Sequence, residues 1–160
     1  MKIKLNYFLS IVSIITIILP SCRHEVDYKI VREDVIMQHD KLMADDEKLM
    51  HHKMQLDTLA LSLGKLKVQQ PALDTAKVHQ EITAINNKLN AASDKMSNWM
   101  QQFKTDADGK SNAQAVAYFG AEKVKVTRLD SIYRNLLKES SAYLEKFNVK
   151  DDTATHKHQH

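Results

Sequence analysis

Hydrophobic residues recur along most of this chain at alternating steps of three and four, the spacing of one helical face in a coiled coil. The pattern is uninterrupted at Val78, Ile82, Ile85, Leu89, Ala92, Met96, Trp99 and Phe103. It continues, with Glu122 and Ser140 as polar interruptions, at Ala115, Phe119, Glu122, Val126, Leu129, Tyr133, Leu136, Ser140, Tyr143 and Phe147. An earlier stretch has strict steps of seven, at Val35, Leu42, Leu49, Leu56 and Leu63. Leu59 and Leu66 join this pattern towards its end.

Two breaks divide this pattern into three helices. Gln69-Gln70-Pro71 interrupts it once, and the turn-forming stretch 105–112 interrupts it again, with Ser111 or Asn112 as the expected N-cap of the next helix. We therefore predict helices over residues 27–68, 73–104 and 112–147. Strand signals are absent, because no alternating apolar run is bounded by turn residues.

The predicted fold class is all-α, an elongated antiparallel three-helix bundle or coiled coil. Short connections require consecutive helices to lie antiparallel, and each apolar stripe needs a partner to cover it. The same heptad pattern also serves intermolecular coiled coils. A helical hairpin completed by a second copy therefore stays open as an alternative.

The N-terminus has the parts of a secretory leader. Lys2 and Lys4 supply positive charge, and the apolar stretch Tyr7–Leu19 follows them. As a helix this stretch covers roughly 20 Å, against about 30 Å of bilayer hydrocarbon, so cleavage is favoured over a permanent span. Leu19-Pro20-Ser21-Cys22 resembles a bacterial lipobox, with Pro20 departing from the usual residue. The resemblance implies lipidation of Cys22, the only cysteine in the chain; an uncleaved anchor or an ordinary signal peptide is the alternative.

These features predict a domain organisation. Residues 1–21 are the signal peptide, 22–26 the lipidated cysteine and a short tether, 27–148 the bundle, and 149–160 a disordered tail that carries three histidines. Cleavage removes two lysines and no acids, which leaves 21 basic and 20 acidic side chains interleaved. A nearly neutral chain without a basic patch gives no reason to expect a nucleic-acid partner.

Three segments carry a family resemblance: 34–43, 96–103 and 118–123. They resemble a family of small helical lipoproteins from Bacteroidetes that often bears the label "viral A-type inclusion protein", a label that reflects coiled-coil similarity. The resemblance covers the mature domain in order and implies no activity and no catalytic residues. This chain departs from the family in its histidine-bearing tail and in Lys41, where the family tends to be acidic.

One cluster on the first predicted helix combines thioether and imidazole groups: Met37, His39, Met43, Met50, His51, His52 and Met54. Such ligands suit Cu(I) and, by extension, Ag(I). At about 100° per residue, one helix flank collects His39, Met43, Met50 and Met54. Methionine also fills irregular helical cores, and Ile36 lies on this flank. We therefore expect the methionines to pack against the third helix with no metal bound, and a soft-metal site at His39, Met43, Met50 and Met54 is the alternative.

No catalytic arrangement stands out in the sequence. The acidic run Asp45-Asp46-Glu47 lies among lysines, as on a solvated helix surface, and Trp99 falls on the apolar seam. We expect no enzymatic activity and no cofactor. The expected function is that of a lipid-anchored helical protein of the cell envelope, with a structural or protein-interaction role and either a protein partner or a second copy bound through a helix face. Periplasmic copper or silver sequestration is the alternative.

The residues after Cys22 predict an outer-membrane lipoprotein whose domain faces the periplasm. Arg23 is not the aspartate that retains enterobacterial lipoproteins in the inner membrane, and 23–27 lacks the strongly acidic run of many surface-exposed lipoproteins. Protease added to intact cells should therefore leave the domain uncut, as judged by immunoblot, and should degrade it after lysis. Loss of the domain from intact cells would contradict the periplasmic orientation.

Overall fold

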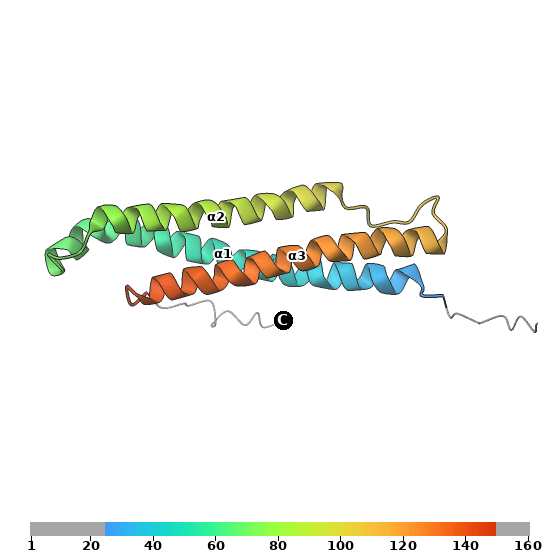
Figure 1. The fold of residues 1–160 in the computed structure, drawn as a ribbon, viewed down its shortest axis with the longest axis horizontal. Helices are drawn as coiled ribbons and strands as arrows, with labels where there is room; N and C mark the ends of the chain where they lie inside the picture. The colour runs from blue at the N-terminus through green and yellow to red at the C-terminus, as the bar shows by residue number, and fades with distance from the viewer. Residues whose placement is uncertain (1–24, 150–160) are drawn as a thin grey trace, which may run out of the picture.

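The computed structural model describes residues 25–149. They form three helices, α1 (Tyr28–Gln69), α2 (Thr75–Gln102) and α3 (Asn112–Glu145), which lie side by side in an elongated bundle (Figure 1). The chain reverses at both connections, so α1 and α3 run in one direction and α2 runs against them. The predicted all-α antiparallel three-helix bundle is confirmed, and its core forms within one chain. The predictions for residues 1–21, Cys22 and the tail beyond Val149 lie outside the described residues.

The helix ends follow local capping chemistry, and they differ from the predicted bounds by at most two residues. The Asp74 side chain accepts a hydrogen bond from the Lys77 amide at the start of α2. Ser111 caps α3 and forms a reciprocal capping box with Gln114, which satisfies two backbone donors that the first turn leaves unpaired. The predicted capped turn before α3 is thus confirmed. Gly109, with φ of 73°, supplies the left-handed conformation that this turn needs.

A side-chain clamp joins the beginnings of α1 and α3. Asn112 Oδ1 accepts from the Tyr28 amide at 3.0 Å, and Asn112 Nδ2 donates to the Val26 carbonyl at 2.9 Å. The two helices therefore start at the same end of the bundle. At the other end, Phe147 and Val149 pack against the core, so Val149 belongs with the bundle and not with the predicted tail.

The core consists of the residues that the heptad pattern selects. Val35, Leu42, Leu49 and Leu56 are each 0% exposed. Their counterparts on α2 and α3 are equally inaccessible and include Ile82, Leu89, Met96, Phe119, Val126 and Tyr133. Asp45, His52 and Leu59 form a second buried row on α1 beside the residues at steps of seven. Within residues 25–149, no helix is long and apolar enough to cross a bilayer.

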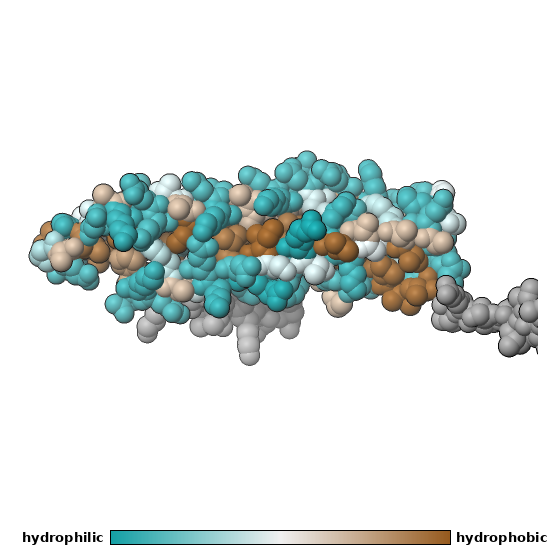
Figure 2. Space-filling model, viewed as in Figure 1, coloured by the Kyte–Doolittle hydropathy of each residue, from teal (hydrophilic) through white to brown (hydrophobic). Residues whose placement is uncertain are grey.

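The three helix interfaces differ in extent. α1 packs most extensively against α3, and the interface between α2 and α3 is the smallest. On the face formed by α2 and α3, a hydrophobic band runs lengthwise between hydrophilic rows (Figure 2). Polar contacts bridge this seam: Lys88 Nζ lies 2.6 Å from Glu139 Oε1, and the Tyr143 hydroxyl lies 3.1 Å from Glu81 Oε2.

Leu49→Ala should destabilise the bundle by about 2–5 kcal/mol, because the substitution leaves a cavity in a fully packed layer. Leu61→Ala is the matched control, since Leu61 is on the same helix and is 90% exposed; its effect should stay within about 0.5 kcal/mol. Urea unfolding followed by helical circular dichroism measures both. Equal destabilisation by the two substitutions would contradict the core assignment.

Candidate functional site

Trp99 and Glu122 form a polar contact inside the core. Trp99 is 6% exposed and its Nε1 donates to Glu122 Oε2 at 2.8 Å, while Lys125 Nζ lies 2.7 Å from Glu122 Oε1. The prediction that Trp99 lies in the core is confirmed. Glu122 interrupts the apolar seam of α3 because it is the acceptor that holds the indole ring in one orientation.

Asp46 links all three helices. Its Oδ1 accepts from Ser93 Oγ on α2 at 2.8 Å and from the Tyr133 hydroxyl on α3 at 2.7 Å. Burial, followed by the hydrogen bond to Asp46, raises the pKa of Tyr133, so the phenol stays a donor. The prediction of a solvated acidic run is therefore wrong for Asp46, although Glu47 is exposed.

Asp45 is the second exception to that prediction, because it is only 6% exposed. Its carboxylate oxygens lie 2.8 Å from Lys48 Nζ and 2.9 Å from Lys41 Nζ. Burial alone would raise the pKa of Asp45, but the hydrogen bonds from the two lysines outweigh it and hold the pKa below its usual value. Lys41 also reaches Asp130 on α3, so this ion-pair group helps to join α1 to α3.

His52 takes part in the core and not in the methionine cluster. It is 1% exposed, and its Nδ1 lies 2.6 Å from Ser140 Oγ on α3. Ser140 Oγ donates to the Leu136 carbonyl at 2.7 Å. The second polar interruption of the α3 seam therefore has a structural explanation: Ser140 leaves room for, and bonds to, an imidazole from α1.

The methionines Met37, Met43, Met50 and Met54 of α1 are exposed, so the prediction of a second buried stripe is wrong. Met43, Met50 and Met54 are 42%, 43% and 59% exposed, and Met37 is 63% exposed. Polar residues of α1 that contact α3 include Gln38, which accepts from Thr127, and His52, which contacts Ser140. Those residues take the place on α3 that the methionines were expected to occupy.

His39 belongs to the alternative soft-metal set, and its side chain contacts α2. Its Nε2 lies 3.3 Å from Met100 Sδ on α2, and its Nδ1 lies 2.9 Å from Asp40 Oδ1. The His39 and Trp99 rings are 5.9 Å apart. Met43 is one turn further along α1 than His39. Met50 and Met54 lie about 16 and 22 Å from His39 along the helix axis, at 1.5 Å per residue. In the structure, His39 and Met43 are therefore near each other, and Met50 and Met54 are far from them. Met100, which the sequence did not select, lies beside His39.

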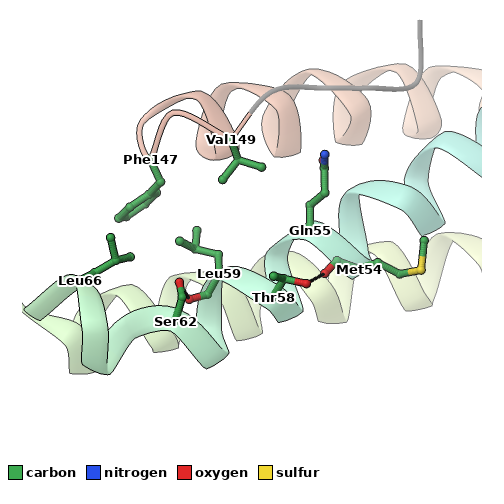
Figure 3. A pocket seen from close by; sticks show the side chains of 8 residues that line it. All are labelled: Met54, Gln55, Thr58, Leu59, Ser62, Leu66, Phe147 and Val149. Carbon is green, nitrogen blue, oxygen red and sulfur yellow. Dashed lines mark hydrogen bonds between the residues drawn. The ribbon is translucent and has the colours of Figure 1, made fainter. Parts of the chain in front are cut away.

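Met54 borders an open groove near the far end of α1. Leu59 and Leu66 line the groove from α1, and Phe147 and Val149 line it from the turn after α3, enclosing about 290 Å³ (Figure 3). The Thr58 hydroxyl donates to the Met54 carbonyl and is thereby satisfied. The remaining lining is mostly apolar, so the groove offers packing surface and few polar contacts.

Comparison of the chain with protein-family models, with curated proteins and with solved structures finds no match. The resemblance to the Bacteroidetes lipoproteins stays a prediction. Among residues 25–149, no three His, Cys, Asp or Glu side chains are grouped so that they could hold a metal ion. A hard-metal or zinc centre therefore has no ligand set there, and a site built from thioethers is a separate question.

Acidification should unfold the bundle partly through Asp45. Because the folded-state pKa of Asp45 is lowered, its ion pairs stabilise the fold above the unfolded pKa of about 3.9. This stabilisation is lost as the pH falls through the lower folded value. We expect the urea midpoint to fall between pH 5 and pH 3, and to fall less in Asp45→Asn. Exposed Asp94→Asn serves as the control and should follow the parent; identical pH dependence in all three proteins would contradict the role of Asp45.

Proposed function

We propose that this chain is a lipid-anchored helical protein of the cell envelope that has a non-enzymatic, protein-interaction role. Signal cleavage before Cys22 and lipidation of that residue would hold the bundle at the membrane. Several acyl chains bind a bilayer stably, so the domain needs no apolar face for membrane insertion. We also propose that the lipid anchor is in the outer membrane and that the bundle faces the periplasm.

The observation that carries the interaction role is an exposed apolar stripe on α1, which we define as Met43, Met50, Met54, Leu61 and Val68. Its members are 42–90% exposed although the core of the bundle is complete. The residues follow one another at steps of seven, four, seven and seven, so they stay on one flank of the helix. An unpartnered stripe of this kind is typical of a binding surface.

The occupant we propose for the α1 stripe is an amphipathic helix of a partner protein. The stripe extends over the 26 residues from Met43 to Val68, or about 37 Å of helix. Its steps of seven and four match those of a partner helix lying alongside. Methionine side chains adapt to varied partner surfaces. The groove beside Met54 adds a depression next to the stripe, bounded by Leu59 and Phe147.

The alternative docking surface, the seam between α2 and α3, is less suitable. Its apolar residues are nearly covered: Ile85 is 5% exposed and Leu136 is 7% exposed. The Lys88–Glu139 ion pair crosses the seam. A partner helix would have to displace such cross-helix contacts there, whereas the α1 stripe is already accessible.

Photo-crosslinking in intact cells tests the interaction role. A photoreactive amino acid in place of Leu61 should give a discrete adduct with one protein, because the side chain would lie inside the interface. The same substitution at Lys95, an exposed position on α2, is the matched control and should give none. Leu61→Lys together with Met54→Lys should reduce co-purification of that partner from native membranes at least tenfold.

Each outcome of the crosslinking has a definite meaning. An adduct of twice the chain's mass would identify a second copy as the occupant and would overturn the proposed heterologous partner. Absence of any specific adduct from Leu61 in cells that express the folded, membrane-bound protein would overturn the interaction role of the stripe.

A further inference from the structure

We propose that His39, Met100 and Met43 form a binding site for one soft monovalent cation, Cu(I) or Ag(I), at the outer edge of the interface between α1 and α2. This inference goes beyond the interaction role and does not depend on it. It replaces the four-residue set that the sequence offered as an alternative by a set drawn from two helices.

The contact between His39 and Met100 brings together two donor atoms that suit a soft ion. Imidazole nitrogen and thioether sulfur are both ligands of Cu(I). The two atoms are 3.3 Å apart, and even the zinc bonds of about 2.0 Å to imidazole nitrogen and 2.3 Å to thiolate sulfur, taken as a scale, would span about 4.3 Å in a straight line. A single ion beside the pair can therefore touch both atoms in a bent arrangement without movement of either helix.

Asp40 prepares the imidazole for metal binding. Its Oδ1 lies 2.9 Å from His39 Nδ1, and an ionised carboxylate can only accept, so Nδ1 carries the proton of this contact. In the neutral ring the lone pair is then on Nε2, the atom that faces Met100. A carboxylate on the remote nitrogen is the usual partner of a metal-binding histidine, and its negative charge favours a cation nearby.

Trp99 places an aromatic ring beside the imidazole of the proposed site. The indole is held by Glu122 and stacks on Phe103 with ring centroids 4.9 Å apart, while the His39 ring lies 5.9 Å from the indole. An aromatic face within about 6 Å attracts a cation.

Met43 supplies the third ligand and the route of entry. It follows His39 by four residues, so the two side chains project from adjacent turns of one flank. At 42% exposed it has room to turn, and its three rotatable bonds let the sulfur reach the ion. Met100 is 38% exposed and the His39 side chain 29% exposed, which leaves the donor atoms accessible from solvent.

Competition with the chromophoric Cu(I) chelator bicinchoninate, without oxygen, tests the site. The mature chain with Cys22→Ser is used, because the substitution removes the only thiol. This protein should bind one equivalent of Cu(I). Met100→Leu and His39→Leu should each weaken the affinity at least tenfold, and Met43→Leu should weaken it less. Met54→Leu, on the same helix flank, is the matched control and should bind as the parent does.

The fluorescence of Trp99 gives an independent readout, since it is the only tryptophan. The emission should change in proportion to the added Ag(I) until one equivalent is bound. The Met100→Leu substitution should abolish this change. Circular dichroism shows whether each variant is folded. Because Met100 is at the rim of the bundle, Met100→Leu keeps the test valid even if a His39 variant unfolds.

Three results would overturn the site. If the Met100→Leu variant binds Cu(I) as tightly as the parent, Met100 is not a ligand and the site is wrong. Loss of binding on replacing His156, His158 and His160 by alanine assigns the ion to the tail. Displacement of Cu(I) by an equal concentration of Zn(II) shows imidazole binding without selectivity for a soft ion.

Discussion

The structure depends on the burial of three heptad seams in one shared core. Each helix of the described chain is amphipathic, and none of the three can cover its apolar stripe alone. The mature chain would have no disulfide to assist, so packing carries the stability. Because the seam of α1 meets both other helices, a cavity at Leu49 would disturb all of them, whereas the same truncation at Leu61 would disturb none.

Polar side chains inside this core fix how the helices are aligned. Apolar residues at heptad spacing pack almost equally well after a shift of one heptad, but hydrogen bonds do not survive such a shift. Asp46 bonds to Ser93 and Tyr133, which sets α1 against both neighbours at once. The Trp99–Glu122 bond sets α2 against α3 in the same way. A buried donor left without its acceptor costs about 1–3 kcal/mol, enough to select one alignment.

The proposed metal site follows from that alignment. His39 and Met100 are far apart in the chain and meet only because α2 runs against α1 in the register that Asp46 and Ser93 define. The same bond between Trp99 and Glu122 that stabilises the core places the indole beside the imidazole. The exposed α1 stripe has a different origin: it lies on the flank that the other two helices leave uncovered. The proposed soft-ion site and the proposed protein-binding surface share Met43 and otherwise use different residues of the bundle.

The sequence by itself determined the three helices, the capped start of the third and most of the core positions, because heptad spacing, turn residues and capping chemistry act locally. It also showed that Glu122 and Ser140 interrupt the seam, without showing what they bind. Only the tertiary structure decided that Asp45 is buried, that Asp46 bonds to both neighbouring helices and that the α1 methionines are exposed. The reason is that a helical wheel gives the flank of a residue, while the angle and register of the neighbouring helix decide whether that flank is covered. Met100 joined His39 for the same reason, since a contact between antiparallel helices depends on a register that no local pattern contains.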